Sequence, residues 1–176
     1  NEAGINVIMD VVYNHTSGAV GSQLDVLMPG YYYRYTNTCV LSNGSGCGNE
    51  TASERAMMRK FMIDSVDFWT SEYKLGGFRF DLMGLHDLET MNQVTASAKE
   101  INENIVIYGE PWSGGTSTLA DGDSAKQING NKYQGYGQFN DQMRDALIKG
   151  GLSGAGEVGW ITNKISSVGS AETIDI

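Results

Sequence analysis

The chain is short of positive charge and of long apolar stretches. It has 12 lysines and arginines against 21 aspartates and glutamates, a formal net charge of −9. This balance argues against a nucleic-acid partner, because nucleic acids are bound mainly through cationic contacts to phosphate. No run of about 18 apolar residues is present, so the sequence predicts no membrane-spanning segment. The composition suits a neutral partner such as a sugar.

Cysteine is also scarce. The chain has 2 cysteines, Cys39 and Cys47, in one loop rich in glycine, serine and asparagine. They could close a small disulfide, which would imply an oxidising compartment, or they could remain free thiols. Two ligands alone do not make a zinc site, and no cluster of carboxylates marks a calcium site. The sequence therefore predicts no metal ligands.

What the chain does contain is a globular composition. Its 176 residues are 40% apolar and 19% charged, which is enough for one core of ordinary size. We therefore expect residues 1–176 to belong to one domain. The chain opens with Asn1 rather than methionine, so we expect its true start to lie upstream.

The stretch from Gly76 to Gly84 predicts a short buried strand that ends on a carboxylate. Phe78 and Phe80 should point one way and Arg79 and Asp81 the other, because side chains alternate along a strand. The Arg–Asp pair has two interpretations. It could be a structural ion pair, or Asp81 could be a nucleophile that the neighbouring guanidinium keeps ionised.

An earlier stretch, residues 6–13, is apolar on both faces and is typical of a parallel strand covered by helices. Asp10 interrupts it, and Asn14 and His15 follow at its end. Polar residues at the carboxyl end of a buried strand indicate a site in barrel enzymes. Alternatively, His15 only caps the strand by binding a backbone carbonyl.

Two helices are predicted between the strands. The first should begin at Thr51, because Thr51 and Glu54 form a capping-box pattern. Its apolar face would consist of Met58, Met62, Val66, Trp69 and Tyr73. The second should run over residues 88–102, with an apolar face of Met91, Val94, Ala98 and Ile101.

The long loop over residues 16–50 carries a cluster of aromatic residues, Tyr31–Tyr35. Long loops in compact domains are usually functional. The cluster could stack on sugar faces, or it could pack the loop onto the core.

A third strand, residues 105–108, is followed by Glu110, Pro111 and Trp112. We also expect a short strand at 135–139 and a helix at 141–149 carrying Met143 and Leu147. Strands that alternate with helices predict an α/β fold with a parallel sheet.

The strand ends together suggest retaining glycoside hydrolysis, in which one carboxylate attacks the anomeric carbon and the other acts as acid and base. Arg79 favours the ionised form of Asp81, whereas Pro111 and Trp112 give Glu110 apolar surroundings that favour its protonated form. This difference assigns Asp81 as the nucleophile and Glu110 as the acid/base.

Three motifs resemble the first three signature regions of the α-amylase family of glycoside hydrolases (family thirteen). They are residues 10–15 (Asp-Val-Val-Tyr-Asn-His), 77–81 (Gly-Phe-Arg-Phe-Asp) and 108–112 (Tyr-Gly-Glu-Pro-Trp). The resemblance implies a TIM (β/α)8 barrel, of which this chain would form roughly strands 3 to 6 or 7. It also implies that Asp81 is the nucleophile, that Glu110 is the acid/base and that Arg79 assists the nucleophile.

The same resemblance gives further roles. It implies that His15 contacts the sugar at the cleavage site and that Asp10 is mainly structural. Within the family, residues 77–87, 108–118 and 139–146 are most similar to bacterial type I pullulanases, which hydrolyse α-1,6 branch bonds in α-glucans. Trp112 would then help to form a sugar-binding wall, and Tyr13 and Asn14 are further candidate contacts.

The sequence departs from the family at two points. A His-Asp pair that supplies a third carboxylate is absent, so we predict that residues 1–176 alone are inactive. Leu85 stands where many α-amylases have a histidine, with His86 next to it, which separates this chain from calcium ligation of the α-amylase type, although calcium is otherwise implied by the family. Enzymes of this kind occur both inside cells and on their surface, and a disulfide would favour a secreted or cell-surface location in a bacterium.

Two alternatives stay open. The chain could belong to another enzyme of the family, an α-1,4 hydrolase or a glucanotransferase. It could also be a non-catalytic remnant that binds glucan through Tyr13, Trp112 and the Tyr31–Tyr35 loop. The carboxylates Asp81 and Glu110 count against the remnant, because a binding module needs neither.

Overall fold

The computed structural model describes residues 3–148, which divide into two compact units, one ending at Gln138 and the other beginning at Phe139. The first unit contains strands β1 (Ile8–Val11), β2 (Gly77–Phe80), β3 (Val106–Gly109) and β4 (Gly137–Gln138). Its helices are α1 (Gln23–Leu27), α2 (Ala56–Tyr73) and α3 (Leu88–Ile101), with short 3₁₀ turns η1 (Met83–Leu85), η2 (Asp121–Asp123) and η3 (Gln127–Lys132). The second contains α4 (Asp141–Ile148).

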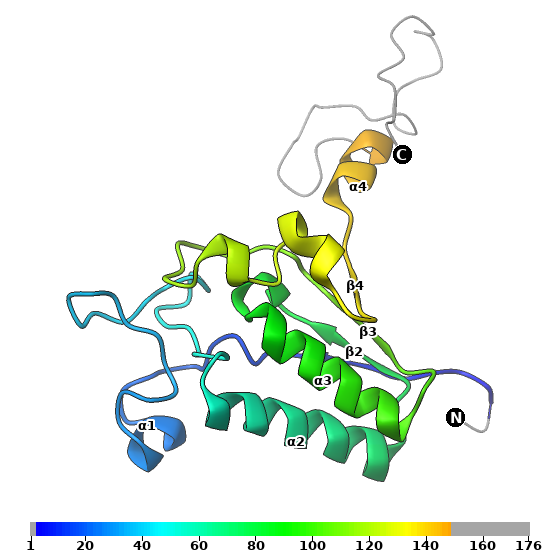
Figure 1. Ribbon diagram of the computed structural model, residues 1–176, viewed down its shortest axis with the longest axis horizontal. Helices are drawn as coiled ribbons and strands as arrows, with labels where there is room; N and C mark the ends of the chain where they lie inside the picture. Colours follow the sequence, from blue (N-terminus) through cyan, green and yellow to red (C-terminus); the bar gives the residue numbers. More distant parts are fainter. Residues whose placement is uncertain (1–2, 149–176) are drawn as a thin grey trace, which may run out of the picture. The chain divides into compact units, whose positions relative to one another are not determined.

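The sheet of the first unit is parallel, with strand order β1-β2-β3-β4. Helices α2 and α3 lie side by side on one of its faces (Figure 1). The predicted α/β class with a parallel sheet is confirmed. In register, Asp10 lies beside Arg79 and Arg79 beside Tyr108, so side chains from three strands share the face away from the helices.

The core forms between the sheet and the two helices. Phe78 and Phe80 of β2 are fully buried there, as the alternation along this strand predicted. The helix faces contribute a set of buried side chains: Met58, Met62, Val66, Met91, Val94 and Ala98. The prediction is wrong for the last residue of each apolar face. Tyr73 at the end of α2 and Ile101 at the end of α3 are exposed.

The capping box predicted at Thr51 does not form, and α2 begins at Ala56. The Thr51 hydroxyl donates instead to the Tyr13 carbonyl at 2.6 Å. The Glu54 carboxylate accepts hydrogen bonds from Nε and Nη2 of the Arg34 guanidinium. Both side chains of the motif are therefore held by tertiary contacts, and the N-cap residue Arg55 has no capping side-chain bond.

The prediction that both faces of the first strand are covered is also wrong. In β1 only Val11 is buried, while Ile8 is 40% exposed and the following Val12 is 51% exposed. Within the described residues β1 is an edge strand, paired on one side with β2. Its apolar face therefore lacks a covering layer in this part of the chain.

The loop over residues 16–50 packs onto the core through its aromatic cluster. Tyr32 and Tyr33 are buried members of the core, which supports packing rather than sugar stacking for these two rings. Cys39 and Cys47 are free and exposed. The structure therefore contains the free thiols and not the disulfide.

The remaining predicted elements are present. The short strand expected near residues 135–139 is β4, and the helix expected at 141–149 is α4, which ends at Ile148. Lys149 lies outside the described residues. No helix among residues 3–148 has the length and apolar character needed to cross a membrane.

Candidate active site

Arg79 is the centre of an ion-pair cluster at the carboxyl ends of β1, β2 and β3. Its Nη1 donates to Asp10 Oδ1 at 2.9 Å and to Asp81 Oδ1 at 3.2 Å. Its Nη2 donates to Glu110 Oε1 at 2.6 Å. Parallel pairing brings these side chains to the same edge of the sheet, so one guanidinium joins the two predicted catalytic carboxylates.

The surroundings keep Arg79 charged. Partial burial lowers the pKa of its guanidinium, but the hydrogen bonds to Asp10 and Asp81 and the charges of Glu110 and Asp10 outweigh this effect and leave that pKa above its ordinary value. The cluster is reachable from solvent, since the side chains of Asp81 and Glu110 remain partly exposed.

Glu110 has a second partner in the backbone of the strand end that carries Asp81. The Leu82 N–H donates to Glu110 Oε2 at 2.9 Å. Leu82 adopts a left-handed conformation with φ 40° and ψ 47°, which is uncommon for a residue with a branched side chain and costs roughly 1–3 kcal/mol. This strained turn aims a peptide N–H at the carboxylate of the neighbouring strand.

Asn14 and His15 extend the cluster on the β1 side. The buried Asn14 amide donates to the Asp81 backbone oxygen at 2.7 Å and to Asp81 Oδ2 at 3.0 Å. Its Oδ1 lies 2.5 Å from His15 Nδ1. Because Asn14 donates to Asp81 through its nitrogen, its oxygen must accept, so His15 carries a proton on Nδ1. His15 thus binds a side chain, and the alternative in which it only caps the strand through a backbone carbonyl is not observed.

Tyr13 lies apart from the Arg79 cluster. Its ring packs against Phe61 and Phe80, and its hydroxyl lies 2.8 Å from Ser65 Oγ. Burial raises the pKa of this phenol, and the Ser65 hydrogen bond only partly opposes the effect. Tyr13 and His15 do line one cavity of about 670 Å³ together with Thr16, Tyr33 and Phe61.

Trp112 is placed by a close backbone approach. A Cβ on Gly84 would come within 2.7 Å of both the backbone nitrogen and the backbone oxygen of Trp112. The Gly84 N–H also donates to the Glu110 carbonyl at 2.9 Å. The turn after β2 therefore lies directly against the segment after β3, which carries Glu110 and Trp112.

One feature of the site differs from the sequence prediction. Arg79 was expected beside Asp81, with Glu110 in apolar surroundings, yet Arg79 Nη2 also donates to Glu110 Oε1 at 2.6 Å. Asp10, implied to be mainly structural, contacts the same guanidinium, and an ion pair of this kind fits a structural role. Strand register decides both contacts, and a single sequence does not reveal register. No sequence pattern predicted the hydrogen bond from the Leu82 N–H to Glu110.

Metal binding finds no support among the described residues. In residues 3–148 no group of three or more histidine, cysteine, aspartate and glutamate side chains could hold a metal ion.

A parallel α/β sheet with an Asp and a Glu at neighbouring strand ends, joined by one Arg, matches the class that the motifs resemble. This class is the retaining glycoside hydrolases of the α-amylase type.

Comparison with known proteins shows which members of this class the chain is similar to. No protein-family profile matches the chain. The chain is 40% identical over 147 residues to a pullulanase of Bacillus subtilis, an alignment that covers 84% of this chain and 20% of that protein. It is 39% identical over 160 residues to a pullulanase of Klebsiella pneumoniae, with 89% of this chain and 14% of that protein covered.

Solved structures similar to this chain are also pullulanases. The pullulanase of Paenibacillus barengoltzii, crystallised with maltohexaose and α-cyclodextrin, superposes with a TM-score of 0.80 at 46% identity, over 84% of this chain and 23% of that one. The type I pullulanase of Bacillus subtilis with maltose gives a TM-score of 0.81 at 38% identity, over 84% and 21%. The chain is thus related in sequence and structure to a segment of the pullulanases, as its motifs predicted. It spans a fifth or less of the length of the two curated relatives, 20% and 14%.

Proposed function

We propose that the natural polypeptide hydrolyses α-1,6-glucosidic branch bonds in α-glucans such as pullulan, starch and glycogen, with retention of configuration. Asp81 is the nucleophile and Glu110 the acid/base. Arg79, Asn14, His15 and Trp112 bind or orient the sugar and the nucleophile. The observation that carries the proposal is the pairing of Asp81 and Glu110 on the single guanidinium of Arg79.

In the first step, the Asp81 carboxylate attacks the anomeric carbon while the Glu110 carboxyl group gives its proton to the departing glycosidic oxygen. The bond to the leaving chain breaks, and a glycosyl ester forms on Asp81. In the second step, Glu110 takes a proton from water, the water oxygen attacks the anomeric carbon, and the ester to Asp81 breaks. Two inversions give net retention.

The surrounding groups suit these roles. The Asn14 amide holds Asp81 by two hydrogen bonds, which fixes the direction of the attacking oxygen. Arg79 and the Leu82 N–H hold the two oxygens of Glu110. Precise placement of reacting groups contributes a large share of enzymatic rate enhancement.

We also propose that the described α/β unit is part of a (β/α)8 barrel in a single catalytic domain, with β1 as the third strand. The parallel order of the sheet and the similarity to the pullulanase structures support this proposal.

The test uses the natural full-length polypeptide and pullulan, in which α-1,6 bonds join maltotriose units. We expect maltotriose as the product. Asp81→Asn and Glu110→Gln should each lower kcat by roughly 1,000-fold or more without changing the circular dichroism spectrum. Glu103→Gln, an exposed carboxylate before β3, is the matched control and should retain activity.

Two other outcomes would contradict this proposal and favour one of the alternatives. Products other than maltotriose would favour a different enzyme of the α-amylase family. Glucan binding without turnover by the natural polypeptide would favour the non-catalytic alternative and contradict the hydrolase proposal.

A further inference from the structure

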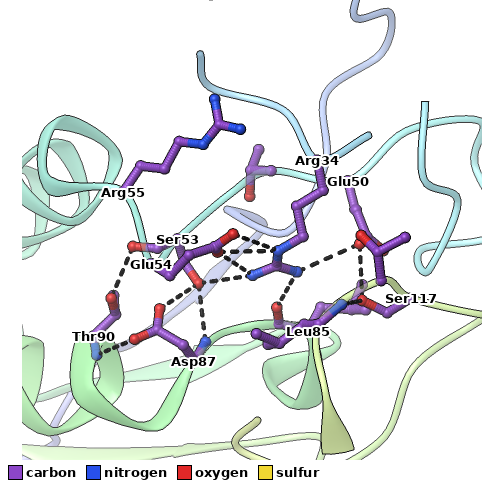
Figure 2. Close-up of polar contacts among 12 residues, drawn as sticks. Arg34, Glu50, Ser53, Glu54, Arg55, Leu85, Asp87, Thr90 and Ser117 are labelled. Atoms are coloured by element: carbon purple, nitrogen blue, oxygen red, sulfur yellow. Dashed lines mark hydrogen bonds and ion pairs between the residues drawn. The ribbon is translucent and has the colours of Figure 1, made fainter. Parts of the chain in front are cut away.

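A buried ion pair lies within the loop over residues 16–50, outside the Arg79 cluster. Arg34 and Glu50 are both buried, and Arg34 Nη1 lies 3.5 Å from Glu50 Oε1 (Figure 2). Isolated charges in a protein interior are costly unless other groups hydrogen-bond them. The additional partners of these two residues therefore indicate what the pair holds in place.

The partners of Arg34 include the turn that follows the candidate nucleophile. Arg34 Nη1 donates to the Leu85 carbonyl at 2.8 Å, and Leu85 ends η1, the turn after Asp81. The same guanidinium binds the Glu54 carboxylate at 2.7 Å and Ser53 Oγ at 3.2 Å. Arg34 thus ties the loop before α2 to the turn after β2 (Figure 2).

The partners of Glu50 belong to the segment that follows the candidate acid/base. Its Oε1 accepts the Ser117 hydroxyl at 2.8 Å, and its Oε2 accepts the Gly44 N–H at 2.6 Å. Residues 113–118 follow Trp112 directly in the chain. The carboxylate of Glu50 therefore connects this segment to the loop at residues 42–46 and, through Arg34, to η1.

The backbones of these segments also touch. A Cβ on Gly114 would come within 2.3 Å of the Ser45 carbonyl, and one on Gly115 within 2.5 Å of the Asn43 carbonyl. The Gly115 N–H donates to the Gly44 carbonyl at 2.8 Å. The adjacent glycines at 114 and 115 are thus required by a close approach of two main chains, with Glu50 at its buried side.

We propose that Glu50 is a positioning residue for the glucan site. Together with Arg34 it fixes residues 113–118 relative to η1, and so holds Trp112, the residue directly before this segment, in its place against Gly84. The inference rests on the proposed glucan hydrolysis and extends it to a residue that contacts neither substrate nor the reacting carboxylates.

A charge is needed at this position because one carboxylate serves three donors. A Glu50→Gln variant has only one side-chain oxygen. If this oxygen accepts the Gly44 N–H, the amide NH2 group faces the Ser117 hydroxyl and the Arg34 cation; if it accepts the Ser117 hydroxyl, the NH2 group faces the Gly44 N–H. Glu54→Gln is the matched control. Glu54 binds the same guanidinium but is more exposed, and its hydrogen bonds with Arg34 do not involve residues 113–118.

The first readout is steady-state kinetics of the natural full-length polypeptide on pullulan. Glu50→Gln should raise KM roughly tenfold and change kcat less than about threefold, because Trp112 is a proposed glucan contact while Arg79 and Leu82 still hold Glu110. Partial unfolding would instead lower the apparent kcat and leave KM unchanged. Glu54→Gln should leave KM within about twofold of the wild-type value. An unchanged KM in Glu50→Gln, or an equal rise in both variants, overturns the proposal.

The second readout does not depend on turnover. Hydrogen–deuterium exchange should become faster at residues 43–46 and 113–118 in Glu50→Gln but not in Glu54→Gln, with α2 and α3 unchanged in both. If the wild-type polypeptide fails to cleave pullulan, the proposed function fails, and this exchange pattern still decides whether Glu50 fixes the segment. Equal exchange in the wild type and Glu50→Gln contradicts the inference.

Discussion

The guanidinium of Arg79 binds three carboxylates from three strands, which makes it the residue on which the geometry of the site depends. Its planar fork reaches Asp10, Asp81 and Glu110 at the same time. A lysine ammonium is a compact charge on a flexible stem and does not reproduce a fork of this kind.

We therefore expect Arg79→Lys to lower kcat/KM on pullulan by roughly 100-fold although the positive charge is kept. Circular dichroism serves as the control for folding. A variant within about threefold of the wild type would show that only the charge of Arg79 matters, not its geometry.

His86 is a second residue whose surroundings have a measurable consequence. It is fully buried with its ring edge-on to Phe80, and within the described part of the chain neither ring nitrogen has a hydrogen-bond partner. Burial, reinforced by the Arg34 charge, lowers the pKa of His86 to about 3. The unfolded chain takes up a proton near the ordinary pKa of about 6.5, so folding is disfavoured progressively as the pH falls below that value.

We predict that between about pH 7 and about pH 5 the wild type loses about 2 kcal/mol more unfolding free energy than His86→Leu, in which no group at this position titrates. Denaturant titrations at the two pH values measure this difference. Equal losses in both proteins would mean that His86 is protonated in the folded state.

At the scale of elements, the turn η1 couples the ends of β2 and β3. It begins after the strained Leu82, and its Gly84 lies against the Trp112 backbone. Main-chain atoms cannot move aside as a flexible side chain can, so a methyl group at this position must displace one of the two segments.

Gly84→Ala should accordingly destabilise the fold by roughly 1–3 kcal/mol and lower activity on pullulan. Gly122→Ala is the matched control, because a Cβ there has no neighbour within 4 Å. Thermal unfolding and initial rates of both variants test this. A Gly84→Ala protein as stable and active as the control would exclude a tight contact between η1 and Trp112.

At the scale of the whole molecule, the excess of acidic residues bears on the choice of partner. The chain carries a formal net charge of −9, whereas an α-glucan is neutral and releases no counterions when it binds. We expect the KM of the natural polypeptide for pullulan to change less than about twofold between roughly 0.05 M and 0.5 M salt. A strong dependence on salt would point to a charged partner instead.

The sequence alone determined the order and type of the main elements and predicted the candidate site residues. Alternation placed Phe78 and Phe80 inward and Arg79 and Asp81 outward, because side-chain direction in a strand is a local property. The apolar periodicity of residues 58–66 and 91–98 marked the buried faces of α2 and α3 for the same reason. The motifs around His15, Asp81 and Glu110 indicated the family, which the comparisons support.

Only the tertiary structure decided which groups meet. Parallel register brought Asp10 and Glu110 to Arg79, and a long-range bond to the Tyr13 carbonyl removed Thr51 from its expected capping role. The pairing of Arg34 with Glu50, and of Glu50 with Ser117, joins residues far apart in the chain. Local patterns set the direction of a side chain, but its partner depends on how distant segments pack, and that information is not local.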